Sequence, residues 1–418
     1  VSADRRMPIR LGIVGKTNTG KTTFFNAATL SAAKVSTYPF TTKTPNSAAA
    51  NVLTPCVCRE FKVKDNPKNS ACVEGWREVP VELIDLPGLI KGAWEGKGLG
   101  NRFLSVAASS DALLHVVDAS GSVDPEGKIT EAGTGDPVLD VLDIEEELVK
   151  WLWKVIQENH DRITREIKSG AELAEAMTAV LSGSKVTESH VEASLKMSRL
   201  NGGEFTGWSS DDLLLFSEKL RQVSKPTLIV ANKMDLASSA ENFKRLQDEF
   251  PDTIIVPCSA EAELALRRAE ARNLIRYVPG EERFEVLDQS RLSEKQRWAL
   301  SHIRTKVLGE YMRTGVQFSI NVAVFKLLRM NAVYPVYDPK RLSDKRGNVL
   351  PDVFLLPSGS TVTDLAGQIH SDLARGLLFA LDARTGLRLP AQYQLKDRDV
   401  LNMVSTARKP KPKSKPQK

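Results

Sequence analysis

Short apolar runs that end on polar residues recur along the first two thirds of the chain. The first run, Ile9 to Val14, stops at a glycine-containing loop and is followed by TTFFNAATL, a pattern that predicts strand, loop and helix. Four later runs are similar: VPVELIDLPG, ALLHVVDAS, PTLIVANKMD and TIIVPCSA. Strands of a parallel sheet end in this way when their carboxyl ends build a site. The alternation of these strands with amphipathic segments predicts a doubly wound, mostly parallel α/β domain.

An insertion separates the third apolar run from the fourth, because the gap far exceeds the roughly 30 residues of a simple strand-helix-strand unit. Asp143 is expected to cap a helix whose first turn, Glu145 to Glu147, is acidic and whose apolar residues recur at helical spacing up to Gly170. Further helices are expected in AELAEAMTAVL, TESHVEASLKMSRL and SDDLLLFSEKLRQV. Their apolar residues form stripes, which predicts a small helical subdomain packed on itself or on the sheet.

After the fifth run the pattern changes to helices, in SEKQRWALSHIRTKVLGEYM and SINVAVFKLLRM, and then to short strands. VLPDVFLLPSGSTVTDLAGQIHSDL predicts a strand, a glycine turn and a capped helix, and RLPAQYQLKDRDVLNMVS predicts two more strands around an acidic turn. The predicted organisation is a P-loop domain of residues 1–140 and 224–290, a helical insert 141–223, a helical connecting segment 291–348, a compact domain 349–407 and a tail 408–418.

Composition places the chain among globular proteins, with 418 residues and 41% hydrophobic residues. No stretch approaches the roughly 18 uninterrupted apolar residues of a membrane span, and VSADRRMPIR lacks the apolar core of a secretory signal, so a cytoplasmic protein without membrane attachment is expected. The net charge of +6 comes from the last eleven residues, RKPKPKSKPQK. This proline-interrupted tail, expected to be disordered, is either simply solvated or binds RNA.

Three of the four cysteines lie close together in the sequence: Cys56, Cys58 and Cys72. A closed zinc site takes four ligands, and no other cysteine or histidine stands beside them. The expectation is therefore free thiols, or one disulfide if the source cytoplasm permits it, rather than a metal site.

The most specific motif is GKTNTGKT, which satisfies G-x-x-x-x-G-K-[ST] between a predicted strand and a predicted helix. In such a loop, backbone N–H groups from Asn18 to Thr23 wrap a diphosphate, Lys21 reaches the β- and γ-phosphates, and Thr22 ligates Mg²⁺. The predicted phosphate-binding residues are Gly15, Lys16, Thr17, Asn18, Thr19, Gly20, Lys21, Thr22 and Thr23.

The base that this loop serves is indicated by NKMD, which follows the fourth apolar run and contains Asn232, Lys233 and Asp235. The carboxylate of Asp235 can accept two hydrogen bonds from guanine, whereas adenine would leave it unpaired at a cost of about 1–3 kcal/mol or more. Ser259, Ala260 and Glu261 follow the fifth run, where a backbone contact to guanine O6 is expected. Together these motifs predict GTP and GDP as ligands.

Two further segments supply the expected magnesium and γ-phosphate contacts. Asp85 in DLPG ends the second run and is predicted to hold Mg²⁺ through water, while the N–H of Gly88 meets the γ-phosphate. The segment YPFTTKTPN lies where a switch loop supplies a threonine to Mg²⁺. Thr42 is the predicted ligand, with Thr41 as the alternative. The predicted metal ligands are thus Thr22, Thr42 and Asp85, and the predicted catalytic groups are Lys21, Thr42 and Gly88.

The residue after DLPG is Leu89, at the position where small GTPases of the Ras type place the glutamine that orients the attacking water. Leucine cannot do this, so slow intrinsic hydrolysis is expected, with acceleration by a partner, an ion or another group. Asn18 is a candidate for helping to hold K⁺ against the phosphates, and the alternative is that it only shapes the loop.

YPFTTKTPN, DLPGLIKGAWEGKGLGNRFL and LLHVVD together resemble the Obg-related GTPases, and in particular their archaeal YchF-like branch. The resemblance extends past the GTPase core, since GNVLPDVFLLPSGSTVTDLAGQIHSDL with YQLKDRDV is similar to a TGS domain, a ubiquitin-like β-grasp module. The resemblance implies association with the ribosome, tRNA or other RNA. The best-known YchF members have lost the NKxD motif and favour ATP, whereas this chain retains NKMD. In relatives a histidine linked to hydrolysis often follows the FL pair of GLGNRFL, and Val106 stands there in this chain.

The sequence therefore predicts a Mg²⁺-dependent GTPase that works as a switch, with the insert and the TGS-like domain passing the nucleotide state to a partner. Two alternatives remain at this point. The chain is an RNA- or ribosome-binding factor that uses nucleotide mainly to stabilise its fold, or it is an ATPase, which Asp235 argues against. Neither the oligomeric state nor the target follows from the residues.

Overall fold

The computed structural model describes residues 8–30, 47–88, 91–96 and 100–406. The chain forms two compact units, and each is described by itself. Among the described residues, the larger unit takes those within Ile9–Asn51 and Val81–Ala323, and the smaller unit takes Pro8, Val52–Pro80 and those from Val324 onward. The smaller unit therefore combines two segments that are far apart in the sequence, which no pattern along the chain indicates.

The larger unit is built on the mostly parallel sheet that the apolar runs predict. The sheet order is β2 (Ser47–Pro55), β4 (Trp76–Asp85), β1 (Arg10–Val14), β5 (Ala112–Asp118), β6 (Thr227–Asn232) and β7 (Ile255–Pro257). β3 (Ala71–Val73) pairs antiparallel with the first residues of β4, and both of these stretches belong to the smaller unit. β1 pairs in parallel with β4 and β5, and the parallel pairing continues through β6 to β7. Every residue of β5 is buried, as expected for a strand covered on both faces. The apolar pattern does not predict β2, because SAAANVLTP is made largely of small and polar residues.

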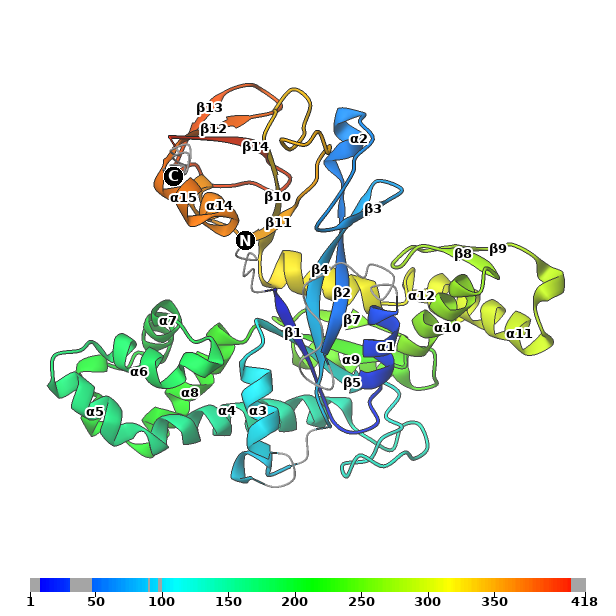
Figure 1. Ribbon diagram of the computed structural model, residues 1–418. Helices are drawn as coiled ribbons and strands as arrows, with labels where there is room; N and C mark the ends of the chain where they lie inside the picture. The colour runs from blue at the N-terminus through cyan, green and yellow to red at the C-terminus, as the bar shows by residue number, and fades with distance from the viewer. Residues whose placement is uncertain (1–7, 31–46, 89–90, 97–99, 407–418) are drawn as a thin grey trace, which may run out of the picture. The chain divides into compact units, whose positions relative to one another are not determined.

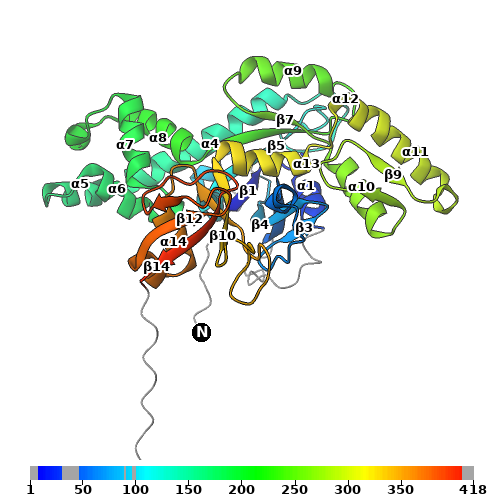
Figure 2. The same cartoon turned by 90° about the horizontal axis from the view of Figure 1, so that it is seen from above.

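Helices cover both faces of this sheet. α1 (Lys21–Thr29) packs with α10 (Ala260–Ala271), and α4 (Pro137–Glu158) packs with α9 (Ser239–Glu249). Figure 2 shows α1 and α9 on opposite sides of the strands. The short 3-10 helix η2 (Ala93–Glu95) and α3 (Gly100–Ala108) lie between β4 and β5 in the chain.

The predicted helical insert is present, and it continues from α4 (Figure 1). Its elements are α5 (His160–Lys168), α6 (Leu173–Leu181), η3 (Ser182–Ser184), α7 (Glu188–Ser198), η4 (Gly202–Gly207) and α8 (Ser210–Ser224). Leu152, Phe205 and Phe216 lie in an apolar core that these helices share with α4. The insert is therefore stabilised by burying the helical stripes against one another.

The predicted start of the first insert helix is wrong. The N-cap of α4 is Asp136, whose side chain accepts a hydrogen bond from the N–H of Val138, and Pro137 occupies the first helical position. A proline fits there because its missing N–H would have no helical partner. Asp143 instead lies inside the helix, and the helix ends at Glu158 rather than running unbroken to Gly170.

The C-terminal part of the larger unit holds a hairpin and further helices. The elements are β8 (Ile275–Tyr277), β9 (Phe284–Val286), η5 (Gln289–Arg291), α11 (Glu294–His302), the π-helix η6 (Ile303–Leu308), α12 (Gly309–Tyr311), α13 (Val316–Asn321) and the π-helix η7 (Val322–Leu327), which runs past the end of the unit. β8 and β9 pair antiparallel, and Ile275, Phe284 and Val307 lie in one apolar core with α10 and α11.

The smaller unit carries a mixed five-stranded sheet with α14 (Val362–Ile369) and α15 (Ser371–Arg375). The strand order is β11 (Phe354–Pro357), β10 (Met330–Val336), β14 (Val400–Ser405), β12 (Leu377–Asp382) and β13 (Arg388–Pro390). β10 and β14 run parallel, and the other pairs are antiparallel. Leu365 of α14 packs against Val333 and Leu401 in the core. This is a β-grasp arrangement.

Two strands of this sheet differ from the expectation. β10 lies within residues 291–348, the range predicted to be helical, but the π-helix before it ends at Leu327. Ala332, Val333 and Tyr334 of β10 are all fully buried, and a run that is buried on both faces cannot be told from a buried helix by its sequence alone. β12 is also absent from the prediction, which expects two strands after α14 where the structure has three.

Candidate nucleotide-binding site

The glycine-rich loop of residues 15–20 joins β1 to α1. Only glycine fits at its two motif glycine positions, because neighbouring atoms lie too close for a side chain. A Cβ at Gly15 would lie 2.3 Å from the backbone oxygen of Val116, and a Cβ at Gly20 would lie 2.2 Å from Nδ2 of Asn232. Both glycines also have positive φ, +146° and +98°, where other residues are strained. The loop is therefore held tightly between β5 and the NKMD segment.

Lys21 begins α1, and its ammonium group turns back over the loop. Nζ donates a hydrogen bond to the carbonyl oxygen of Lys16 at 2.5 Å, and the residue is only 6% exposed. Burial lowers the pKa of Lys21 to about 8, against the opposing attraction of Asp85. Within the part of the chain that the structure describes, one carbonyl and a nearby carboxylate offset the charge of this buried cation, so it is well suited to bind an anionic phosphate.

Thr22 and Asp85, which are 63 residues apart in sequence, meet beside this lysine. The hydroxyl of Thr22 donates to Oδ2 of Asp85 at 2.8 Å. The other carboxylate oxygen, Oδ1, is buried and has no hydrogen-bond partner among the described residues, and burial raises the pKa of Asp85 above its ordinary value. A threonine hydroxyl beside an unpaired carboxylate oxygen fits the oxygen-rich ligand set that Mg²⁺ prefers. Thr42 and its alternative Thr41 lie outside the described residues.

Gly88 of DLPG lies directly against the glycine-rich loop. A Cβ at this position would lie 2.3 Å from Oγ1 of Thr17 and 2.8 Å from the Thr17 backbone nitrogen. The structure thus brings the DLPG segment to the loop, as the predicted γ-phosphate contact requires. Leu89 lies outside the described residues.

On the side of the site where the base is expected, Asn232 forms hydrogen bonds to two other segments of the site. Its amide nitrogen donates to the carbonyl oxygen of Thr19 at 2.9 Å, and its amide oxygen accepts from the N–H of Ala260 at 3.0 Å. Asp235 accepts from the hydroxyl of Ser259 at 2.6 Å. The sequence motifs around residues 15–22, 232–235 and 259–261 therefore meet at one edge of the sheet, where β1, β6 and β7 end.

The remaining predicted base-side residues lie on α10. Ser259 caps this helix by accepting a hydrogen bond from the N–H of Ala262. Ala260 is buried, whereas Glu261 is exposed in the first turn.

Asp118 is a site residue whose role the sequence did not reveal. Lys233 of NKMD donates to its Oδ2 at 2.9 Å, and the side chain of Asp118 is almost fully buried. The same carboxylate accepts hydrogen bonds from the backbone and hydroxyl groups of Ser120 and Ser122. The D-x-S-x-S spacing after a buried strand was the available signal. Asp118 orients Lys233, and it thereby supports the segment that carries Asp235.

Lys16 points away from the glycine-rich loop, toward α4. Its ammonium group pairs with Asp140 and Asp143, each at 2.7 Å, and the Lys16 and Asp140 side chains are 9% and 6% exposed. Burial alone would lower the pKa of Lys16, but the two carboxylates outweigh it and raise the pKa above its ordinary value. The predicted nucleotide contact of Lys16 is thus restricted to its backbone, because its side chain anchors the loop to the first helix of the insert.

The side chains of Asn18 and Thr19 stabilise the loop itself. Asn18 has a positive φ of 63°, and its amide nitrogen donates to the carbonyl oxygen of Gly127 at 2.9 Å. The hydroxyl of Thr19 donates to the carbonyl oxygen of Lys16 at 3.1 Å. Thr23 is half-buried in the first turn of α1. The Asn18 contact favours its loop-shaping role, and K⁺ binding stays a prediction.

The fold and these contacts define the class of protein as a P-loop nucleotide-binding protein with the motifs of a GTPase. Three family models match: 50S ribosome-binding GTPase at residues 10–152, the G4 motif-containing domain of YGR210-like Obg-like GTPases at 230–338, and the TGS domain at 345–405. A GTP-binding protein of Methanocaldococcus jannaschii is 43% identical over 398 residues, which cover 95% of this chain and 99% of the relative.

Two further relatives give the same result. A GTP-binding protein from Pyrococcus horikoshii, known from its crystal structure, has 36% sequence identity to this chain. The two structures align with a TM-score of 0.77, and the alignment covers 95% of this chain and 100% of that one. The ribosome-binding ATPase YchF of Bacillus subtilis is 30% identical over 277 residues, which cover 64% of this chain and 70% of the relative. The chain belongs to the YchF-like family of Obg-like GTP-binding proteins, with a C-terminal TGS domain. The predicted family and fold class are confirmed.

Among the described residues, no helix is long and apolar enough to cross a membrane.

Proposed function

We propose that the chain is a GTPase that hydrolyses GTP slowly with Mg²⁺ and acts as a molecular switch in ribosome or RNA association in the cytoplasm. The observation that supports the nucleotide assignment is the contact of NKMD with the glycine-rich loop: Asn232 bonds to Thr19 and Ala260, and Asp235 bonds to Ser259. An acceptor carboxylate at that position selects guanine, whose N1–H and 2-amino groups both donate.

The proposed division of labour follows from the contacts of each group. Lys21 holds the β- and γ-phosphates with its buried ammonium, and the N–H of Gly88 donates to the γ-phosphate oxygen on which charge develops. Thr22, Asp85 and Thr42 would hold Mg²⁺, which supplies charge neutralisation on the phosphates when bound. Thr42 is proposed from its place in the sequence.

Slow turnover is proposed because the two usual sources of water activation are missing. Leu89 replaces the glutamine of Ras-type enzymes. Val106 stands where many relatives have a histidine, and it is half-buried against the apolar core of the insert. Neither side chain can accept a proton or orient a water molecule. A partner or an ion is therefore expected to accelerate hydrolysis, and Asn18 remains the proposed K⁺ contact.

We propose that the bound nucleotide controls binding to a partner, and that the helical insert (141–223) and the TGS-like domain (349–407) pass the nucleotide state to that partner. The Lys16 ion pairs with Asp140 and Asp143 support the first part, since they join the phosphate-binding loop to α4 and so to the insert core. The name of the Bacillus relative supports the ribosome as the partner. The basic residues of the tail 408–418 are proposed to contribute attraction to RNA.

The test of base specificity is competitive binding of GDP, GTP, ADP and ATP, with Mg²⁺, to the wild type, Asp235→Ala and the exposed control Asp252→Ala. Loss of two hydrogen bonds to a carboxylate costs about 2–4 kcal/mol, so guanine affinity in Asp235→Ala should fall about 30- to 1000-fold. Asp235→Asn should instead gain affinity for xanthosine diphosphate, because the asparagine amide donates to the oxygen at C2 of xanthine. Equal affinity of the wild type for ADP and GDP would contradict the guanine assignment.

A second candidate function is ATP hydrolysis, which the name of the Bacillus relative favours. The same binding series decides between the two, since an ATPase would prefer adenine and be unaffected by Asp235→Ala.

The switch is tested by ribosome co-sedimentation with a non-hydrolysable GTP analogue against GDP. Tighter binding with the analogue supports the switch, whereas salt-dependent binding that ignores the nucleotide supports a factor that uses nucleotide structurally.

Substantial turnover by the isolated protein in sodium buffer would contradict slow intrinsic hydrolysis. Equal rates in K⁺ and Na⁺ would contradict the K⁺ contact.

A further inference from the structure

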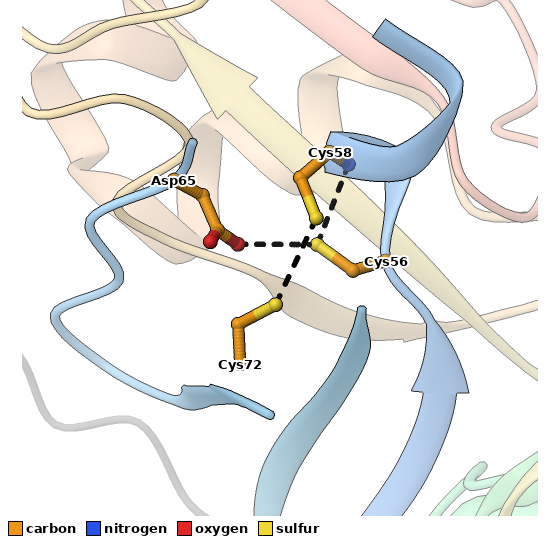
Figure 3. A group of neighbouring side chains, drawn as sticks. All are labelled: Cys56, Cys58, Asp65 and Cys72. Atoms are coloured by element: carbon orange, nitrogen blue, oxygen red, sulfur yellow. Dashed lines mark hydrogen bonds between the residues drawn. The ribbon is translucent and has the colours of Figure 1, made fainter. Parts of the chain in front are cut away.

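Four side chains with metal-ligating atoms converge in the smaller unit (Figure 3). Cys56 caps the N-terminus of α2 (Val57–Phe61), Cys58 lies in its first turn, Asp65 lies in the loop 62–70, and Cys72 lies on β3. Their sulfur and carboxylate oxygen atoms all lie within 4.8 Å of one another. The fourth member of this group is a carboxylate, whereas the expectation from the sequence considered only cysteine and histidine beside the three cysteines.

Two of the separations are close to the edges of a zinc tetrahedron. With Zn–S of about 2.3 Å and Zn–O of about 2.1 Å, tetrahedral angles place two sulfurs about 3.8 Å apart and a sulfur and an oxygen about 3.6 Å apart. The Sγ atoms of Cys58 and Cys72 are 3.8 Å apart, and Sγ of Cys56 lies 3.3 Å from Oδ2 of Asp65. A disulfide would need a separation of about 2.05 Å, and all four cysteines of the chain are free.

The surroundings stabilise anionic ligands. The N–H of Cys58 points to Sγ of Cys56 at 3.5 Å, and the guanidinium of Arg77 lies 3.1 Å from Oδ2 of Asp65. Arg77 is fully buried, and it also donates to Ser70 and to the carbonyl oxygen of Leu350, each at 3.0 Å. Hydrogen bonds of this kind orient metal ligands. Three thiolates and a carboxylate carry four negative charges, and a divalent cation with Arg77 offsets most of them.

We propose that Cys56, Cys58, Asp65 and Cys72 bind one zinc ion in a closed structural site. Thiolate-rich sets select zinc, copper(I) or iron, and the hard carboxylate oxygen of Asp65 argues against copper(I). Four protein ligands complete a tetrahedron, and Cys56 and Cys58 are less than a tenth exposed, so the site offers no position for a substrate. Its role is to hold the fold.

The proposed ion fastens a loop that organises the approach to β11. The N–H of Asn66 donates to the carbonyl oxygen of Val349 at 2.8 Å, and the N–H of Lys68 donates to that of Pro351 at 2.7 Å. Asn69 exchanges two hydrogen bonds with the backbone of Val353. Through Asp65, zinc would connect this loop to α2 and β3, and so hold the segment before β11 in place.

The test measures zinc in the full-length protein after reduction, loading with zinc chloride and removal of unbound metal. The wild type should retain about one zinc per chain, and Cys72→Ser and Asp65→Ala should each lose at least ten-fold in zinc affinity. Cys258→Ser, which alters the buried cysteine of the larger unit, and Asp252→Ala should keep the wild-type content.

A second measurement keeps the proposal falsifiable if a variant folds poorly. Cobalt(II) added to the metal-free wild type should give a thiolate-to-cobalt charge-transfer band, and all four cysteines should react with a thiol reagent in protein denatured without reductant. Two reactive thiols would indicate a disulfide and overturn the proposal. A fully reduced wild type that retains no zinc, a Cys72→Ser variant with wild-type zinc affinity, or preference for iron over zinc would overturn it equally.

Discussion

The ion pairs of Lys16 offer a direct test of how the phosphate-binding loop is connected to the helical insert. Replacing Lys16 by methionine keeps an unbranched side chain that is one atom shorter and removes the charge, which leaves the carboxylates of Asp140 and Asp143 without their main partner. The side chains of Lys16 and Asp140 are both less than a tenth exposed, so water cannot replace the lost interaction. Breaking a buried pair in this way costs about 3–5 kcal/mol.

The chain supplies a matched control for this change. Lys91 also faces Asp143, at 3.7 Å, but its side chain is 78% exposed. Lys91→Met should therefore change stability by only about 0–1 kcal/mol. The double variant Asp140→Asn with Asp143→Asn strands the buried ammonium and should cost about as much as Lys16→Met. Combining all three substitutions removes every charge and should recover a large part of the loss, because a buried pair replaced by neutral groups is often tolerated.

Native-state hydrogen exchange is the suitable assay, because a chain of several domains does not unfold in two states. The free energy of local opening is read at the amides of the 15–20 loop and of α4, and its changes are combined in a double-mutant cycle. The expected signature is a strong favourable coupling between Lys16 and the two aspartates, confined to these segments. If Lys16→Met costs no more than Lys91→Met, or if the effects simply add, the loop is not anchored to the insert through this lysine.

Three further predictions concern the site itself. Burial lowers the pKa of Lys21 from 10.5 to about 8, so the cost of the buried ammonium in the nucleotide-free protein builds up as the pH falls from 10.5 to about 8 and is complete below that value. Lys21→Met should therefore raise the unfolding midpoint at about pH 7, less at about pH 10, and abolish GDP binding. A lower midpoint at neutral pH would contradict this. Gly88→Ala forces a Cβ against the glycine-rich loop and should weaken binding of a GTP analogue at least ten-fold in equilibrium dialysis. The control Gly183→Ala should have no effect, because an added Cβ there would meet no atom within 4 Å. Equal affinities in the two variants would refute the contact. Asp118→Asn removes the charge that holds Lys233 and should lower GDP affinity about ten-fold. The preference for guanine over adenine, measured by competition, should not change. A changed preference would mean that Asp118 contacts the base itself.

The proposed zinc site and the nucleotide site are separable in these experiments. The zinc ligands all lie in the smaller unit, whereas Lys21, Asp85 and Asp235 lie in the larger one. Zinc content can therefore be measured without nucleotide, and nucleotide affinity can be measured on the zinc-ligand variants. Loss of zinc in Cys72→Ser with unchanged GDP affinity would show that the metal serves the smaller unit alone.

The sequence by itself determined the features that depend on neighbouring residues. GKTNTGKT between a strand and a helix specifies the loop, since Gly15 and Gly20 take positive φ there and Lys21 starts the helix. The capped helices also follow from local chemistry: Thr187 and Thr361 each accept a hydrogen bond from the third residue of the helix that they begin. The polar ends of the buried strands predicted the edge of the sheet at which the motifs meet.

Only the tertiary structure decided the contacts between distant residues. Asn232 reaches Thr19 across 213 positions, and Lys16 reaches Asp140 because α4 begins at Pro137, a boundary that the acidic run at 145–147 obscured. Such pairs depend on strand order and helix packing, which no local pattern encodes. Asp65 is the clearest case: in sequence it is one acidic loop residue among many, and it becomes a candidate metal ligand only when the turn after α2 brings it to three cysteines.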